Sequence, residues 1–180
     1  MDRLVRILVY LILKKCGFMN TDLKPSKTCL SLVLKFEGFD PMPYICPAGY
    51  WTVGIGTRIK SKEDFLKKHP NGITFTEAQD ELMAHMEKVV EPSIKTQVKV
   101  ALTQNQFDAL LSFIYNVGAD AFAKSTLLKL LNEKDFSGAA KEFRKWNKGT
   151  VRGALVVLAG LTRRRAAEEL LFEDKEWRIV

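Results

Sequence analysis

The chain has 180 residues, of which 47% are hydrophobic and 27% charged. This composition excludes a disordered chain and is typical of a folded protein of one domain, with a core large enough to form without disulfides. The net charge of +7 favours a polyanionic partner: nucleic acid, an anionic membrane or an anionic cell wall. The positive charge gathers late, with eight Lys or Arg and one acidic residue between Lys141 and Arg165.

The N-terminal segment, residues 1–24, differs from the rest. Residues 4–13 are apolar apart from Arg6, and two lysines follow. This run is too short to span a bilayer, which takes about 20 residues, and no small-residue cleavage site follows it. Two interpretations stay open: a helix packed on the domain, or a degenerate export or membrane-association segment. We assign residues 25–180 to a single catalytic domain.

The first elements expected in the domain are a helix and a hairpin. Ser26 can cap a helix that runs to Glu37 and ends at Gly38. Residues 44–46 and 51–55 are rich in β-formers, and residues 47–50 give a turn signal between them. This hairpin, or small three-stranded sheet, is the only β-structure that we expect.

Helices are expected throughout the remainder. Capping boxes are predicted at Thr76 with Gln79, opening a helix to about Val90, and at Thr103 with Gln106. The second box opens residues 107–115, which are apolar almost all round and therefore central to the core. Shorter helices are expected at 125–131, 135–146 and 161–172. The predicted fold class is α+β, with a small β-lobe, a larger helical lobe and a cleft between them.

Glu37 is the first candidate for chemistry. It lies in the last turn of its helix, where the macrodipole disfavours a negative charge. Position alone favours an ordinary exposed side chain. A hairpin that folds back over a helix-end carboxyl changes this interpretation, because glycosidic cleavage needs an acid on one side of the bond and a water-holding or attacking group on the other.

Three motifs, taken in their order along the chain, resemble those of the phage lysozymes of the T4 type, glycoside hydrolase family 24. That family's pattern is Glu, eight residues, usually Asp, five residues, then Thr; Glu37, Cys46 and Thr52 occupy those positions. The flanking Glu-Gly-Phe and Gly-Tyr-Trp-Thr-Val-Gly-Ile-Gly also match. Similar matches are residues 102–110 with 113–118, and Gly-Leu-Thr-Arg-Arg-Arg at 160–165. The resemblance covers about residues 26–172 and implies a lysozyme-like fold.

The resemblance also implies roles for individual residues. Glu37 corresponds to the general acid, Thr52 to the residue that positions the nucleophilic water, and Arg163 to a basic residue that holds the acid. The positions that match the saccharide cleft are Tyr115, Asn116, Lys124 and Ser125. The family inverts anomeric configuration, uses no cofactor and cuts the β-1,4 bond between N-acetylmuramic acid and N-acetylglucosamine in peptidoglycan.

Cys46 departs from the family pattern, because a thiol stands where an Asp is usual. A thiol hydrogen-bonds water only weakly and is a poorer base than a carboxylate. Three interpretations stay open: a tolerated substitution with Thr52 orienting the water, a disulfide switch with Cys16 or Cys29 as the partner, or loss of activity. Three cysteines and two histidines show no metal-like spacing, so no metal site is predicted.

The sequence gives weaker evidence of a chemical role for the remaining candidate residues. The aromatic side chains are expected in the core rather than stacked on a sugar: Phe113, Tyr115 and Trp146. The histidines, His69 and His85, are expected to be solvated or structural. No chemical partner is evident for Asp108 or Asp120.

The competing function class is a basic module that binds nucleic acid or membrane. That class leaves the motif at residues 37–57 unexplained, and the sequence has no nucleic-acid-binding signature. The sequence therefore predicts a monomeric endolysin that causes host cell lysis and binds no nucleic acid. Residues 4–13 are also expected to allow contact with a membrane. The protein would be made in the cytoplasm of the host bacterium and would reach the periplasm and cell wall by holin release or by export.

Overall fold

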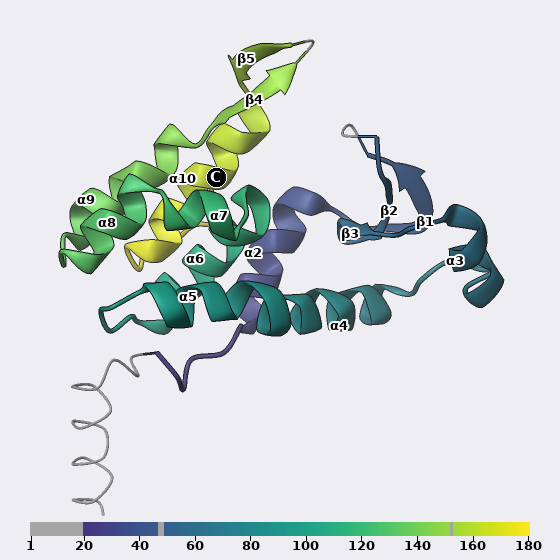
Figure 1. Ribbon diagram of the computed structural model, residues 1–180, viewed down its shortest axis with the longest axis horizontal. Helices are drawn as coiled ribbons and strands as arrows, with labels where there is room; N and C mark the ends of the chain where they lie inside the picture. Colours follow the sequence, from purple (N-terminus) through teal and green to yellow (C-terminus); the bar gives the residue numbers. More distant parts are fainter. Residues whose placement is uncertain (1–19, 47–48, 152) are drawn as a thin grey trace, which may run out of the picture.

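The computed structural model describes residues 20–46, 49–151 and 153–180. The apolar run at residues 4–13 and Cys16 lie outside the described residues. A small sheet lobe and a larger helical lobe stand at opposite ends of the molecule, and α2 and α4 lie between them (Figure 1). This arrangement confirms the predicted α+β class. Within the described part, no helix is long and apolar enough to cross a membrane.

Helix α2, Lys27–Glu37, carries the candidate acid at its last residue. Its boundaries are those predicted. The Ser26 hydroxyl accepts a hydrogen bond from the Thr28 amide at 3.0 Å, and Gly38, with φ of +74°, returns its amide to the Leu34 carbonyl. A side-chain cap and a left-handed glycine are the usual helix start and stop. The two ends therefore fix where Glu37 leaves the helix.

The β-lobe is a three-stranded antiparallel sheet in the order β1, β2, β3. The strands are β1 (Asp40–Ile45), β2 (Trp51–Gly54) and the short β3 (Thr57–Arg58). Tyr44 pairs with Thr52, and the Cys46 amide donates to the Tyr50 carbonyl at 3.0 Å across the turn. The predicted hairpin is confirmed. Helix α3 (Lys62–Lys68) follows at the outer end of this lobe (Figure 1).

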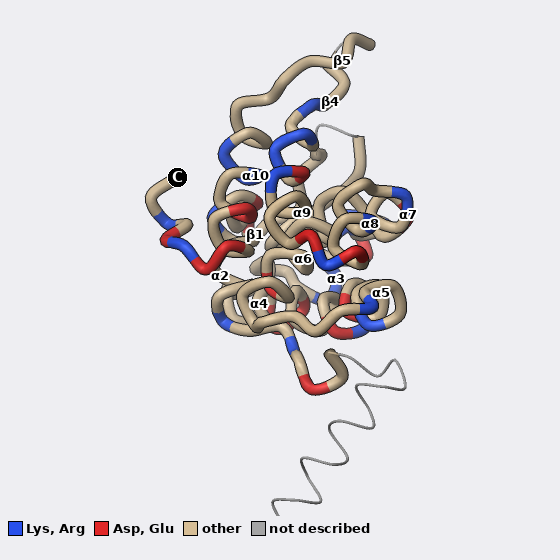
Figure 2. Tube along the Cα trace, turned by 90° about the vertical axis from the view of Figure 1, so that its left-hand side faces the viewer, with Lys and Arg blue, Asp and Glu red and all other residues tan. Residues whose placement is uncertain are grey.

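A second hairpin corrects the expectation that the first was the only β-structure. Strands β4 (Lys148–Val151) and β5 (Ala154–Val157) pair antiparallel around Gly153, with φ of +82°. The β-branched residues in each strand and the glycine between them are the sequence signal for a hairpin. The hairpin projects from the helical lobe beside the start of α10, where Lys and Arg segments gather in Figure 2.

Helix α4 (Phe75–His85) begins two residues earlier than predicted. The capping box is formed by Thr74 and Glu77, whereas Thr76 lies inside the helix. Both pairs have the required spacing, and the structure uses the earlier one. The chain then continues without a break through a π-helical turn (η1, Met86–Val90) into α5 (Glu91–Gln97). This run joins the two lobes (Figure 1).

Helix α6 (Gln104–Val117) forms the centre of the core, as predicted. Its capping box of Thr103 and Gln106 is present, and Gly118 ends it. It packs against α2 and against α10 (Ala159–Phe172). The other elements of the helical lobe are α7 (Ala119–Ala123), α8 (Thr126–Asn132), α9 (Phe136–Glu142) and the 3-10 turn η2 (Phe143–Lys145).

Aromatic packing shows why α6 is apolar on nearly every side. The Phe113 ring meets the rings of Phe143 and Trp146 edge-on, with centroids 5.2 and 5.4 Å apart. Edge-to-face contacts of this kind are typical of a packed core. Phe113 and Trp146 are therefore core residues, as expected. Tyr115, two residues beyond Phe113, instead reaches the space between the lobes.

Candidate active site

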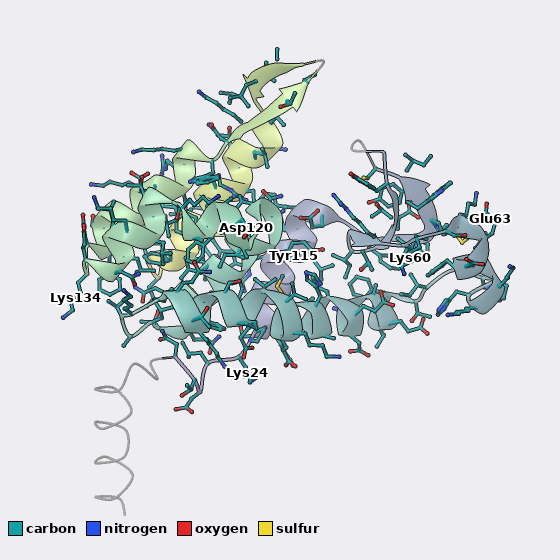
Figure 3. All side chains as sticks on the ribbon, viewed as in Figure 1. Lys24, Lys60, Glu63, Tyr115, Asp120 and Lys134 are labelled. Carbon is teal, nitrogen blue, oxygen red and sulfur yellow. The ribbon has the colours of Figure 1, made fainter. Side chains whose placement is uncertain are left out.

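A cleft of about 730 Å³ lies between the lobes. Its walls come from the end of α2, the β2–β3 turn, α4 and the end of α6, and Tyr115, labelled in Figure 3, is one of its lining residues. The lining residues are Glu37, Gly56, Thr57, Arg58, Glu81, Leu82, Ala84, His85, Tyr115 and Asn116. A volume of this size is typical of a ligand-binding cleft.

A second hollow, of about 600 Å³, lies on the other side of Glu37. Glu37 and Asn116 line both hollows. The second is bounded by the start of α10, including Arg163, and by the C-terminal Val180. Two of the predicted site residues thus line both spaces.

The Glu37 carboxylate is held by Arg164. The side chain of Glu37 is 24% exposed, and its Oε1 accepts a hydrogen bond from Nη1 of Arg164, which is only 3% exposed. A charge-assisted bond to a buried guanidinium fixes the direction of a carboxyl group. The acid candidate is therefore pre-oriented at the edge of the cleft.

Arg164 is itself fixed by the core. Its Nε donates to Glu168 at 3.1 Å, and its Nη2 donates to the Ser112 carbonyl at 3.2 Å. Burial works to lower the pKa of Arg164, but the charges of Glu168 and Glu37 outweigh it and the pKa is raised. The guanidinium is charged at any pH at which the protein works.

The pairing with Arg164 corrects the expectation for Arg163. Arg163 is exposed and lines the second hollow, and it makes no ion pair within the described part of the chain. One residue along a helix is a step of about 100°, so only one of two adjacent arginines can face α2. On α10 the inward position falls on Arg164, one turn before the buried Glu168.

Gly56 brings the sheet lobe against Glu37. Its φ of +76° favours glycine, and a Cβ there would lie 3.1 Å from the Tyr115 hydroxyl oxygen and 3.6 Å from Glu37 Oε2. The Tyr115 hydroxyl donates to the Ile55 carbonyl at 2.9 Å. Burial, and then the charge of Glu37, raises the pKa of Tyr115 to about 12, so the hydroxyl remains a donor. A Cβ at position 56 would therefore crowd the Tyr115 hydroxyl, which would have to shift by a few tenths of an ångström.

Thr52 and Cys46 belong to the β1–β2 hairpin and are not among the residues that line the two hollows. Thr52 is 3% exposed, and its hydroxyl donates to the Tyr50 carbonyl at 3.1 Å. Tyr44 pairs with Thr52 across the sheet. Burial raises the pKa of Tyr44, and the charges of Cys46 and Glu37 raise it further. Cys46 and Glu37 therefore both lie within electrostatic reach of one tyrosine.

The cysteines bear on the disulfide hypothesis. Cys29 is a free thiol, fully buried inside α2, and burial raises its pKa well above the ordinary value. A pairing of Cys29 with Cys46 is not formed in the structure. Cys16, the other candidate partner, lies outside the described residues.

Lys124 and Ser125 are not among the residues that line the two hollows. Lys124 is exposed after α7. Ser125 is buried and caps α8: its hydroxyl accepts from the Leu128 amide at 3.1 Å and donates to the Phe122 carbonyl at 2.7 Å. The structure brings Tyr115 and Asn116 to Glu37, but not these two.

Sequence reasoning missed the buried ion cluster behind Glu37. Glu168, at 0% exposure, accepts from Ser112, Arg164 and Arg165. The sequence signal for this cluster was Arg-Arg-x-x-Glu at residues 164–168, because side chains three or four residues apart on a helix lie next to each other. Among the described residues, no group of three or more His, Cys, Asp or Glu is placed to hold a metal ion.

Comparisons with known proteins agree with this geometry. Residues 34–168 match the family model for phage lysozyme. The chain is 41% identical over 152 residues to an endolysin of Acyrthosiphon pisum secondary endosymbiont phage 1, covering 83% of this chain and 97% of that protein. Among solved structures, an endolysin from Escherichia coli O157:H7 phage FAHEc1 is 33% identical with a TM-score of 0.75, covering 85% and 95% of the two chains.

A second solved structure is similar to the same extent. The muramidase domain of SpmX from Asticaccaulis excentricus is 32% identical, with a TM-score of 0.73, and 83% of this chain covers 97% of that domain. The family model and these relatives span both lobes and the residues around Glu37. The chain belongs to the phage lysozyme family and is a glycosidase.

Proposed function

We propose that the chain is an endolysin of the T4 type, glycoside hydrolase family 24, that hydrolyses the β-1,4 bond between N-acetylmuramic acid and N-acetylglucosamine in bacterial peptidoglycan. The observation that carries this is the placement of Glu37. It is a carboxyl at a helix end, oriented by a buried arginine, at the junction of two hollows that together suit a glycan strand.

Glu37 is the general acid in this proposal. It donates its proton to the glycosidic oxygen as the bond from that oxygen to the anomeric carbon breaks. Water adds to the anomeric carbon from the opposite face and releases one proton to the solvent, which restores the proton balance for the next turnover. The reaction is inverting, so no covalent glycosyl-enzyme forms. Asn116 and Tyr115 line the cleft wall beside the acid and contact the saccharide.

Thr52 orients the water. Because its proton is donated to the Tyr50 carbonyl, the Thr52 oxygen can offer only lone pairs to a third group. It would then accept an O–H bond from water and leave the water oxygen free to attack. Cys46, in the same β1–β2 hairpin, is only a weak hydrogen-bonding group, so it permits the reaction without acting as a strong base.

The proposal also covers the location and the oligomeric state of the enzyme. Residues 25–180 act as the catalytic domain and as a monomer, without nucleic acid. The basic end of the helical lobe (Figure 2) attracts anionic wall polymers. Residues 1–24 provide an export route or membrane contact, or else a holin releases the protein from the cytoplasm to the periplasm.

Clearing of permeabilised bacteria tests the function. The wild-type chain is expected to lower turbidity, and Glu37→Gln is expected to lose at least about 100-fold in rate, because general acid catalysis contributes about 10²–10⁴-fold. Glu63→Gln, on the distant helix α3 (Figure 3), is the matched control and should clear normally. Undiminished clearing by Glu37→Gln would contradict the assignment of the acid.

Cys46 is tested separately. Cys46→Asp is expected to preserve or raise the rate, because a carboxylate holds water at least as well as a thiol. A reductant that raises the wild-type rate, but not the rate of Cys46→Asp, would support the disulfide switch. Absence of any clearing by either protein would favour an inactive lysozyme fold.

A further inference from the structure

Arg165 is a buried arginine that the reaction described above does not use. It lies on α10 beside Arg164, is 0% exposed, and its guanidinium carbon lies 4.9 Å from the centre of the Phe113 ring. Burial lowers its pKa to about 10, so it remains charged at neutral pH. Burying a guanidinium is costly unless it is paired and hydrogen-bonded, so its contacts need to account for it.

Those contacts lead to the cleft. Arg165 Nη2 donates to Asn116 Oδ1 at 3.0 Å and to Glu168 Oε1 at 3.2 Å. Arg165 Nε also lies 3.0 Å from the other oxygen of Glu168. The Nε and Nη2 edge of the guanidinium thus faces the buried carboxylate, and Nη2 also reaches Asn116, which is exposed. Asn116 lines both hollows beside Glu37.

The chemistry of arginine fixes which way the Asn116 amide points. A guanidinium has five N–H donors and no acceptor, so the amide atom that faces it must be the oxygen. The nitrogen Nδ2 is therefore turned away from Arg165. It makes no hydrogen bond within the described part of the chain, and it can only donate.

We propose that Arg165 is a positioning residue that holds Asn116 with Nδ2 facing the cleft, where it donates to the acetamido carbonyl oxygen of an amino sugar. This rests on the proposed muramidase function, whose substrate carries an acetamido group on every sugar. A free amide flips easily and presents either atom. An amide locked by a donor-only partner selects a ligand that offers an acceptor.

Glu168 couples this recognition to the acid. Its Oε1 accepts from Ser112 at 2.7 Å, from Arg164 Nε at 3.1 Å and from Arg165 Nη2 at 3.2 Å. Arg164 holds Glu37 and Arg165 holds Asn116, so both cleft groups are anchored on one buried carboxylate. The sugar that Asn116 binds is thereby placed at a fixed position relative to the proton donor.

The experiment measures binding in the Glu37→Gln background, where no substrate is consumed. Its probes are the β-1,4 tetramers of N-acetylglucosamine and of glucose, both neutral, which differ by the acetamido group. The parent is expected to prefer the acetylated tetramer by about tenfold, the value of roughly one hydrogen bond. Asn116→Asp should lose this preference, because the carboxylate keeps its bond to Arg165 but cannot donate.

Arg165→Met tests the positioning step. It should also lose the preference, since the amide is then free to flip, and adding it to Asn116→Asp should cost no further preference, as expected for residues that act through each other. If Arg165→Met does not fold, Asn116→Asp still decides the donor assignment, because its buried partner is retained. An unchanged preference in Asn116→Asp, or no preference in the parent, would overturn the proposal. The turbidity assay on the wild type tests the muramidase function separately. Failure of that function can therefore be told apart from failure of the proposed acetamido recognition.

Discussion

At the scale of single residues, adjacent arginines on α10 have different tasks. Arg164 is buried between Glu37 and Glu168, whereas Arg163 is exposed. Breaking a buried ion pair by removing one partner costs about 3–5 kcal/mol, because the other charge is left uncompensated. Exposed charges contribute little. The two positions therefore give a matched pair of variants.

We expect Arg164→Met to lower the Tm by about 6 °C or more and to reduce the lysis rate at least tenfold, measured well below its own Tm. Arg163→Met should leave the Tm within about 1 °C of the wild type. Thermal melts and turbidity assays on both proteins check this. The opposite ranking would return the acid-holding role to Arg163.

Tyr115 gives a prediction on pH. The phenol ionises near pH 10 in the unfolded chain, but in the folded protein its pKa is about 12. Below pH 10 it is neutral in both states, so the linkage has no effect there. Between about pH 10 and 12 only the unfolded state releases the proton, so the free energy of unfolding must fall as the pH rises.

Tyr115→Phe removes that titration and also the hydrogen bond to the Ile55 carbonyl. At about pH 9 the variant should be less stable than the wild type by roughly 1 kcal/mol. By about pH 11.5 this difference should narrow or reverse. Denaturant melts of the two proteins at both pH values measure it. A difference that stays constant with pH would show that Tyr115 ionises normally in the fold.

Several site residues could be found from the sequence, and others could not. Glu37, Tyr115 and Asn116 follow from motifs with fixed spacing, and the structure places them at one cleft. Arg164 and Arg165 could not be separated from Arg163, because the choice depends on the rotation of α10 against α2 and α6. That rotation is a product of packing and is not contained in any local pattern.

At the scale of elements, α2 is attached to α6 at its first turn. Asp108, fully buried on α6, accepts from the Ser26 amide at 3.2 Å, from the Ser26 hydroxyl at 2.5 Å and from Gln104 at 3.0 Å. Burial raises its pKa, and these hydrogen bonds work against that rise. The sequence indicated no chemical partner for Asp108, and its partners turn out to be the cap of the acid-bearing helix.

Asp108→Ala is expected to cost about 2–3 kcal/mol, because it leaves the buried polar groups of Ser26 without an acceptor. For a chain of this length that corresponds to a fall in Tm of roughly 4–12 °C. Asp108→Asn keeps the shape and one acceptor, so it should cost less than half as much. Calorimetry on both variants checks the ranking. Since Arg164 holds the other end of α2, the lysis rate below the melting range should be little changed.

The element boundaries show where local signals suffice. Ser26 with Gly38, and Thr103 with Gln106, were predicted because each is an unambiguous cap. The start of α4 was misplaced because Thr74 with Glu77 and Thr76 with Gln79 have the same spacing. The β4–β5 hairpin was missed because its apolar residues have no buried face to reveal an alternation: Leu155 and Val157 are 67% and 58% exposed.

At the scale of the whole molecule, one core extends through both lobes. Val53, Ile55 and Ile73 from the sheet side belong to the same buried cluster as Ile94 and Phe107 from the helical side. The helical run from α4 through η1 to α5 crosses between the lobes (Figure 1). A cluster shared in this way couples the lobes energetically, although an open cleft separates their surfaces.

This coupling predicts a single unfolding transition. Ile55, on the sheet side, and Ile94, on α5, are both 0% exposed. Truncating either to alanine should cost about 2–4 kcal/mol from lost burial and the cavity left behind. Because the core is continuous, each variant should shift the whole transition down by about 4–15 °C rather than melt one lobe alone. Calorimetry should give equal calorimetric and van't Hoff enthalpies for both variants. A second transition in Ile55→Ala, with the main transition unchanged, would mean that the sheet lobe unfolds by itself. In that case the acid at the end of α2 could lose the opposite wall of its cleft while the helical lobe stays folded.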